Sequence, residues 1–562
     1  MHTQNNFASS VLLAISLFLT LFSPTITADT DPAEVVFGER LFLETRFSEY
    51  FYQFINNGGD YNQPLDNGDP QLDKTYRFFG LPPYQIPFAD SPFKGTSYSC
   101  RTCHMVDEHA DQKELGMRTY ADYSSRSPVS KRSDLETTTV RNSPVLVDSA
   151  IQRTNFLLHA DGEFSTLSEL IIGTLTDRNF GWLPGENTLA KEHICNVVKQ
   201  DNGNSDIASE FGGFSYQEIF SGKTNQNTQL PSEYLIEEQF RLDIKNSSCE
   251  KILLSLASLI EIYIDDLRFA KDETILSPYD TFLKINNLPL TPNDNEDDDQ
   301  YSLRLLSSIE SLEKNNKLKF VTANKNTEDG SFQFHDQVYQ FSDVELEGLK
   351  VFFSKSENSD SSSGNCIACH PAPHFTDFKF HNIGVTQVEY DAIHGMNSFN
   401  KLPIPNLRAR DENSEIYLPA THAHPNRQGI FRKVASKSDT SYVDLGAWNI
   451  LFNSDYPNPQ DKLYAMFCDQ ENPCKSKDVA LMRSLATFKT PTLRNLGHSA
   501  PYMHNGQVSD LHAAIGFYIN ISNNSAVGSI RNSDHELNNM AINNEDIQPL
   551  VQFLISLYED YN

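Results

Sequence analysis

Residues Cys100-Arg101-Thr102-Cys103-His104 and Cys366-Ile367-Ala368-Cys369-His370 repeat one pattern, in which two cysteines are separated by two residues and followed directly by a histidine. Covalent attachment of haem needs two thiols, which add across the vinyl groups, and a neighbouring imidazole that reaches the iron. A single CxxC also occurs in redox dithiols and zinc sites. Two copies, each with its histidine, favour c-type haem. We therefore predict two covalently bound haems, with His104 and His370 as proximal iron ligands.

The two motifs lie far apart in a chain of 562 residues with 39% apolar content, which is long enough for more than one packed core. Helical periodicity runs through 248–269 and 546–558, and capping boxes open helices at Thr166 and Ser342. We predict a mainly helical protein with two haem domains in tandem. The expected boundaries are 29–272 for the N-terminal haem domain and 273–562 for the C-terminal one.

The N-terminus has the pattern of a targeting segment. A largely apolar run at 11–22 is followed by Ser23-Pro24 and by the small residue Ala28. This run is too short to span a bilayer, so residues 1–28 are interpreted as a signal peptide that directs export to the periplasm. No positive charge precedes the run, which leaves an N-terminal membrane anchor as the alternative. We expect no membrane span in the mature chain.

The charge of the chain restricts its partners. Lys and Arg number 45 against 75 Asp and Glu, which gives a formal net charge of -30. Such a surface repels nucleic acid and anionic membranes, so neither is expected as a partner. A basic protein is favoured instead.

Four cysteines lie outside the two motifs, namely Cys195, Cys249, Cys468 and Cys474. In an oxidising compartment they can form two disulfides. Pairing of Cys468 with Cys474 is favoured because the intervening loop is short, which leaves Cys195 with Cys249. Free buried thiols are the alternative, and the sequence does not decide the connectivity.

Further motifs surround the haem-binding sequences in a fixed order. They are Phe37 to Ser48, Arg141-Asn142-Ser143-Pro144, Asp161-Gly162, Phe375-Thr376-Asp377, Phe380 to Val385, Phe488 to Asn495, and Pro501 to Gly506. With these motifs the chain resembles the bacterial di-haem cytochrome c peroxidase and MauG superfamily over most of residues 34–558. The resemblance implies a mainly α fold of two cytochrome c-like haem domains in tandem. The chain also has long loop insertions, at about 48–98 and 386–475, which are longer than a minimal member of that superfamily needs.

The resemblance also implies roles for individual residues. The N-terminal haem is expected to react with hydrogen peroxide, whereas the C-terminal haem is expected to carry a sixth protein ligand. Counting from the Pro-Tyr-x-His motif of the family places that ligand at Tyr518, on a helix that Ser509 can cap. Met503 is the alternative ligand. The structural alternative is that Tyr518 is only a packed aromatic side chain. One calcium ion is expected between the domains. Its implied ligands are Asn142, Ser499 and Pro501.

The distal side of the N-terminal haem departs from the family pattern. The family has a Trp where this chain has Ala160, and its distal Gln and Glu correspond to Leu170 and Phe180. None of these three residues can move a proton, so the candidates for acid-base work are His159 and Glu163, with Glu169 and Asp177 nearby. The removable sixth histidine of family peroxidases corresponds to Tyr120. His109 and Met117 are other candidates for that face.

Three functions follow from this reading. The first is a periplasmic oxidoreductase that reduces hydrogen peroxide at the N-terminal haem with electrons relayed through the C-terminal haem. A small basic cytochrome c or a blue-copper protein suits the acidic surface as electron donor. The second is a MauG-like oxidase of a protein or small-molecule substrate, which Tyr518 favours. The third is a non-catalytic electron carrier or redox sensor, which the missing distal Gln and Glu favour.

Overall fold

The computed structural model describes residues 31–73, 77–79, 84–86, 93–104, 125–144, 146, 156–267, 277–322, 339–355, 362–470, 472–496 and 499–558. Its regular structure is mainly helical, as predicted, and the strands in the described part form two short sheets. The predicted signal peptide lies outside these residues. Within the described ranges, no helix combines the length and the apolarity required to cross a bilayer.

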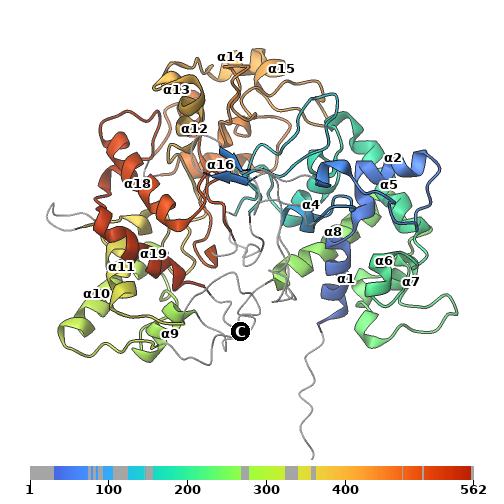
Figure 1. The fold of residues 1–562 in the computed structure, drawn as a ribbon, viewed down its shortest axis with the longest axis horizontal. Coiled ribbons are helices and arrows are strands. Elements are labelled where there is room, and N and C mark those ends of the chain that lie inside the picture. Colours follow the sequence, from blue (N-terminus) through green and yellow to red (C-terminus); the bar gives the residue numbers. More distant parts are fainter. Residues whose placement is uncertain are drawn as a thin grey trace, which may run out of the picture.

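The N-terminal half is organised around α8 (Cys249–Asp266), which coincides with a predicted helix and begins after the capping residue Ser248. Helices α1 and α4 pack along it, on the right-hand side of Figure 1. The crossing of α1 over α8 needs Gly38, because a Cβ there would lie 2.3 Å from the Leu259 carbonyl oxygen. The other helices of this half are α1 (Ala33–Phe42), α2 (Glu49–Asn56), α3 (Cys100–Cys103), α4 (Leu167–Leu175), α5 (Asn187–Gln200), α6 (Asp206–Glu210) and α7 (Tyr216–Ser221).

The C-terminal half has a separate hydrophobic core, built from residues between 279 and 558. At its centre α11 (Asp343–Phe353) packs on α19 (Ile547–Ile555), and a Cβ at Gly348 would lie 2.0 Å from the Pro549 carbonyl oxygen. Ser342 opens α11 with the predicted capping box. The division of the chain into two haem domains at 272 stays a prediction. The other helices of this half are α9 (Pro278–Ile285), α10 (Asp298–Lys314) and α18 (Leu511–Ala526).

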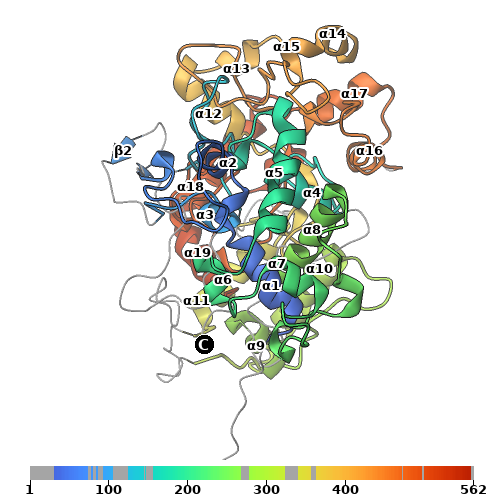
Figure 2. The ribbon, with the colours of Figure 1, turned by 90° about the vertical axis from the view of Figure 1, so that its right-hand side faces the viewer.

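A third layer is formed by residues 385–483, a range that contains the whole of the predicted insertion at 386–475. It has its own core around the fully buried Trp448. Its helices α13 to α15 lie at the top in both views, above the two halves (Figure 1, Figure 2). The helices of this layer are α12 (Val385–His394), α13 (Ser398–Lys401), α14 (Leu407–Glu412), α15 (Ser414–Tyr417), α16 (Gln460–Phe467) and α17 (Lys477–Arg483).

Both disulfides that the sequence favoured are present. Cys195 of α5 is bonded to Cys249 of α8, and Cys468 is bonded to Cys474. The first joins two helices of the N-terminal core, and the second closes a short loop after α16. The four cysteines of the two haem-binding motifs are free.

The two sheets are antiparallel pairs. Strand β1 (Arg77–Phe79) pairs with β2 (Tyr84–Ile86), and β3 (Phe380–His381) pairs with β4 (Phe488–Lys489). The second pair sets Phe380 opposite Lys489 and His381 opposite Phe488. Two motifs that are far apart in the sequence therefore lie side by side.

Candidate active site

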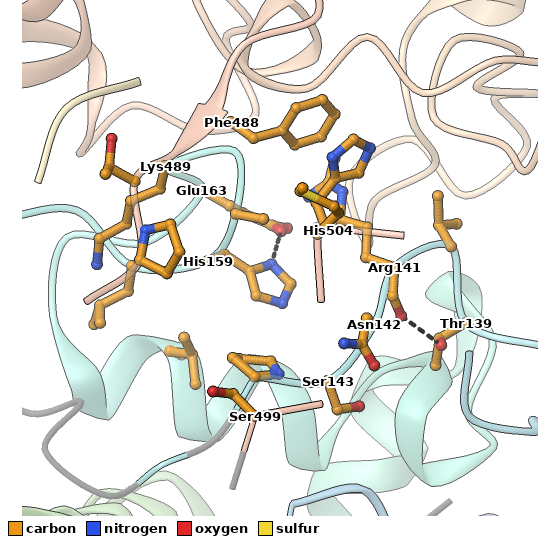
Figure 3. A pocket seen from close by; sticks show the side chains of 18 of the residues that line it. Thr139, Arg141, Asn142, Ser143, His159, Glu163, Phe488, Lys489, Ser499 and His504 are labelled. Atoms are coloured by element: carbon orange, nitrogen blue, oxygen red, sulfur yellow. Dashed lines mark hydrogen bonds and ion pairs between the residues drawn. The ribbon is translucent and has the colours of Figure 1, made fainter. Parts of the chain in front are cut away.

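One cavity of about 1670 Å³ receives both haem-binding motifs. This volume exceeds the roughly 300–1,000 Å³ of an ordinary small-molecule site, so the cavity has room for more than one large group. Figure 3 shows part of its wall, with residues from both halves of the chain. The predicted attachment and proximal residues all line it, namely Cys100, Cys103, His104, Cys366, Cys369 and His370.

The proximal histidines have one nitrogen engaged in the same way. His104 donates from Nδ1 to the Pro144 carbonyl oxygen at 2.7 Å, and His370 donates from Nδ1 to the Phe375 carbonyl oxygen at 2.9 Å. A backbone acceptor at Nδ1 fixes the tautomer in which Nε2 carries the free lone pair. Burial lowers the pKa of both imidazoles, which keeps them neutral, as metal ligands must be.

The motif thiols do not have the properties of a redox dithiol. Burial, with a smaller contribution from the partner cysteine, raises the pKa of Cys100 and of Cys366 to about 12. Reactive dithiols have the opposite property, a lowered pKa. Two free thiols beside a cavity, next to an imidazole held in the ligating tautomer, fit covalent haem. The residues of both motifs therefore suit the group that the sequence predicts.

His159 and His104 both line the cavity, near enough for the charge of His159 to affect the pKa of His104. The His159 ring points into the open space, and its Nδ1 is 3.0 Å from Oε2 of Glu163 (Figure 3). The residue has a left-handed backbone, with φ of 69°, in the tight loop between the bridged residues Leu158 and Phe164. Such strain in a non-glycine residue marks a position that the surrounding structure enforces. The second ring nitrogen is left facing the cavity.

Arg432 completes this group and was missed by the sequence analysis. Its guanidinium lies 2.5 Å from the Glu163 carboxylate and 3.1 Å from the Asp161 carboxylate. Asp161 is fully buried and also pairs with Arg141 at 2.8 Å. Arg432 belongs to the layer at 385–483, where no family motif falls, so no local signal could have identified it. Only the fold brings it to residues about 270 positions earlier in the chain.

The charges of this group set the ionisation of its members. Burial alone raises the pKa of Glu163, but the Arg432 charge and the His159 hydrogen bond outweigh burial and hold that pKa well below its usual range. Asp177 also lines the cavity, and burial together with the negative charge of Glu163 raises its pKa to about 6. His159, Asp161 and Glu163 could bring their ligand atoms within 4.8 Å of one another, as in a metal site. Their carboxylates are already neutralised by two guanidiniums, so we assign no metal there.

The predicted residues of the C-terminal haem site lie in the same cavity. Tyr518 and Met503 both line it. Burial raises the pKa of Tyr518, and the nearby Cys369 and Cys366 add to the effect, which places the phenol beside the attachment cysteines. The expected capping residue was wrong, because Asp510, not Ser509, accepts the hydrogen bond from the Ala513 N–H that opens α18. An Asp accepts this bond with a full negative charge, which the helix N-terminus favours. Ligation of iron by Tyr518 stays a prediction.

The implied calcium ligands also lie together. The Asn142 amide donates to the Pro501 carbonyl oxygen at 2.6 Å, and Ser499 lines the same wall. The other side-chain atom of Asn142, Oδ1, is buried and has no hydrogen-bond partner among the described residues. An orphaned amide oxygen beside a backbone carbonyl is a suitable start of a calcium site. The calcium ion itself stays a prediction.

Comparisons with known proteins identify relatives. The family models searched contain no match to the chain. The curated cytochrome-c peroxidase IdrP2 of Denitromonas iodatirespirans is 26% identical over 216 residues, and IdrP1 of the same organism is 24% identical over 197 residues. Over these segments the chain is similar to proteins named as cytochrome-c peroxidases. The matched segment spans 38% of each relative, and 38% and 35% of this chain.

Two solved structures match most of the chain at low sequence identity and with TM-scores below 0.5. The diheme peroxidase BthA of Burkholderia thailandensis is 16% identical, with a TM-score of 0.43, and the match covers 94% of this chain and 86% of BthA. A MauG-like protein associated with microbial copper homeostasis is 14% identical, with a TM-score of 0.40 over 98% of this chain and 96% of that protein. The superfamily named from the motifs is that of the curated relatives.

The cavity wall departs from the pattern of the superfamily that the motifs resemble at the positions that the sequence indicated. Ala160, Leu170 and Phe180 all line the cavity and offer no acid-base group. Tyr120, His109 and Met117 lie outside the described residues. His159, Glu163 and Asp177 are among the described residues that line this part of the cavity and have side chains able to carry a proton. Glu169 is absent from the described lining. Its carboxylate accepts hydrogen bonds from the Ser165 N–H and the Asn458 amide, and its backbone N–H donates to the Thr166 hydroxyl.

The segment at 386–475 forms part of the cavity wall and contacts the N-terminal half. Pro419, Gln428 and Arg432 are among its residues that line the cavity. It is tied to the N-terminal half by ion pairs of Glu389 with Arg126 at 2.7 Å and of Asp444 with Arg141 at 2.6 Å. The segment therefore closes the pocket around His159 with residues that come from late in the chain.

Proposed function

We propose that this chain is a di-haem c-type oxidoreductase that reduces hydrogen peroxide at the haem held by Cys100, Cys103 and His104. Cys366, Cys369 and His370 would hold the second haem, which would supply the electron relay. One observation carries the proposal: the His159 imidazole faces the cavity that His104 also lines, with Nδ1 held by Glu163. The naming of the curated relatives as cytochrome-c peroxidases supports it.

The reaction consumes two electrons and two protons for each peroxide, and it forms two waters. Bound haem would supply a redox-active iron for the reduction of peroxide and the means to pass electrons. His159 accepts the proton of one peroxide oxygen at its free ring nitrogen and returns it to the other oxygen. Glu163 fixes the tautomer and stabilises the imidazolium that forms, and Arg432 keeps Glu163 ionised.

A second candidate function is the MauG-like oxidation of a protein or small-molecule substrate. The position of Tyr518 beside Cys366 and Cys369 favours it, because a phenolate ligand stabilises the higher oxidation states of iron. The third possibility, a carrier without catalysis, does not explain why His159, Glu163 and Arg432 converge at the wall of the cavity.

The remaining features of the proposal concern the surroundings of the enzyme. The electron donor is a small basic cytochrome c or blue-copper protein that docks on the acidic surface. The chain works in the periplasm after removal of residues 1–28. One calcium ion at Asn142, Ser499 and Pro501 ties the two halves together beside the cavity, and the buried Asn142 Oδ1 supports it.

Substitution of His159 tests the proposal. The variant His159→Leu should lose about 10²–10⁴-fold in steady-state peroxide reduction with a reduced cytochrome c as donor, the usual contribution of a general acid-base group. Its haem content should equal that of the parent. A control is His535→Gln, because the His535 side chain is 82% exposed and lies outside the cavity.

Two results would overturn the proposal. The first is an EPR spectrum that shows both haems of the parent protein to be low-spin, together with no change in that spectrum when peroxide is added. The second is a His159→Leu variant that turns over peroxide at the rate of the parent. An enzyme that oxidises an organic substrate but not a reduced cytochrome would support the MauG-like alternative.

A further inference from the structure

Lys489 stands out among the cations that line the cavity. It lies on β4, and its backbone N–H donates to the Ala160 carbonyl oxygen at 2.8 Å, at the contact between the two halves. Its Nζ lies 3.8 Å from the centre of the Phe156 ring and 6.0 Å from that of Phe378. Figure 3 shows its side chain on the cavity wall, apart from the group formed by His159 and Glu163.

Lys489 has no acidic partner in the described part of the chain. Arg141 and Arg432, two other cations of the cavity wall, each pair with two carboxylates. The immediate surroundings of the Lys489 ammonium are two phenyl rings, which offer only the electrostatic attraction of their faces. Burial lowers the pKa of Lys489 to about 7. An ammonium in such surroundings is costly unless an anion joins it.

The missing anion has to enter through the cavity. The cavity is where the two haem-binding motifs lie, and haem carries two propionate carboxylates on the edge away from the vinyl groups that cysteines take. We propose that Lys489 binds a haem propionate at the wall between the two haem sites. The inference rests on the proposed haem attachment and extends it to a cofactor-binding residue. Both haems carry the same carboxylate, so the experiment has to tell which of them Lys489 contacts.

The pairing has an electrochemical consequence. An ammonium beside a propionate stabilises the reduced haem relative to the oxidised haem, because the oxidised haem carries one more positive charge. Removal of the ammonium therefore lowers the midpoint potential of the haem that it contacts. The other haem lies further away and changes less.

Spectroelectrochemical titration of the full-length holoprotein tests the pairing. In Lys489→Met the midpoint potential of one haem should fall, and the resonance Raman propionate band of the same haem should shift. Lys489→Arg should restore both readouts because it returns the charge. Lys462→Met is the matched control, since the Lys462 ammonium contacts the Phe156 carbonyl oxygen at 3.5 Å and is absent from the described lining of the cavity.

The outcomes separate this inference from the proposed function. Unchanged potentials and propionate bands in Lys489→Met and Lys489→Gln, with two haems bound, overturn the pairing and leave the peroxide reaction intact. An equal fall in Lys462→Met also overturns it, because the effect would then be one of overall charge. Normal shifts in a protein that does not reduce peroxide support the pairing and contradict the proposed function. Denatured protein that retains no haem contradicts both.

Discussion

At the scale of single residues, the site is defined by what each side chain can still bind. His104 and His370 donate from Nδ1 to a carbonyl oxygen, which leaves Nε2 available as the predicted iron ligation requires. The Nδ1 of His159 contacts Glu163, which leaves its other ring nitrogen available for the proposed proton transfer. Tyr518 presents a phenol beside the second pair of motif cysteines. The three rings differ in the acceptor at Nδ1, which is a backbone carbonyl for the two motif histidines and a carboxylate for His159.

Replacement of Tyr518 tests its ligation of iron. The variant Tyr518→Phe removes only the hydroxyl, so it should fold normally and keep two haems. The absorption and EPR spectra of the C-terminal haem should change from those of a six-coordinate centre to those of one that has lost a ligand. Tyr464→Phe on α16 is the control, since Tyr464 is exposed and outside the cavity. A Tyr518→Phe spectrum identical to that of the parent would leave Tyr518 as a packed aromatic.

A buried charge cluster near the start of the chain is set by single residues as well. Glu44 is 1% exposed and accepts hydrogen bonds from Arg46. Burial raises the pKa of Glu44, but Arg46 outweighs it and lowers the pKa from 4.5 to about 2. A lowered pKa in the folded state means that the ionised form stabilises the protein above pH 4.5. That contribution is lost as the pH falls towards 2.

The variant Glu44→Gln should therefore lose stability at neutral pH, by about 3–5 kcal/mol, as expected when one partner of a buried ion pair is removed. The difference from the parent should narrow between pH 4.5 and pH 2. Thermal unfolding of both proteins across this range measures it. A difference that is independent of pH would show that the Glu44 charge does not carry the effect.

At the scale of elements, close helix contacts hold the haem-binding segments in place. Helix α11 ends shortly before Cys366, and it lies so close to α19 that position 348 admits only glycine. Strands β3 and β4 bring the 380 motif beside the 488 motif and so present Phe488 and Lys489 to the cavity. The packing of a few elements thus fixes the second haem site.

Two glycine substitutions test this contact. Gly348→Ala should destabilise the protein by about 1–3 kcal/mol, the usual cost of overpacking, because the new Cβ meets the backbone of Pro549. Gly516→Ala on α18 is the matched control, since nothing lies within 4 Å of its Cβ position, and it should stabilise the helix by about 0.5–1 kcal/mol. Denaturant unfolding measures both. Equal effects of the two variants would show that the α11 to α19 contact can relax.

At the scale of the whole molecule, the third layer and the net charge matter most. The layer at 385–483 joins the two halves and contributes Arg432 to the pocket around His159. The net charge of -30 gives the protein a long-range attraction for basic proteins. This attraction acts on the encounter with the donor and not on the chemistry in the cavity.

Ionic strength should therefore affect the two kinetic constants differently. With a basic cytochrome c as donor, kcat/KM should fall steeply, by about tenfold or more, as salt screens the charges, whereas kcat should change little. A small neutral electron donor provides the control and should show no such dependence. A salt-independent kcat/KM with the basic donor would exclude electrostatic docking on this surface.

Many of the predictions that were confirmed depend on short stretches of sequence. The helix at α8, the capping box at Ser342 and the Cys468–Cys474 disulfide each follow from residues within a few turns of one another. The cap of α18 was wrong by one residue, because Ser509 and Asp510 are both good capping residues and only the backbone decides between them. The Cys195–Cys249 disulfide was predicted by elimination. Its geometry depends on the packing of α5 against α8.

The sequence by itself determined the chemistry of the two haem-binding motifs, because their cysteines and histidine lie within five consecutive residues. It also predicted the helical class and the relation to the cytochrome c peroxidases. Only the tertiary structure decided that both motifs face one cavity, that Arg432 pairs with Glu163, and that Lys489 has no carboxylate partner in the described chain. All three features depend on how residues hundreds of positions apart are arranged in space. Their energies depend on burial and distance, which a one-dimensional pattern does not contain.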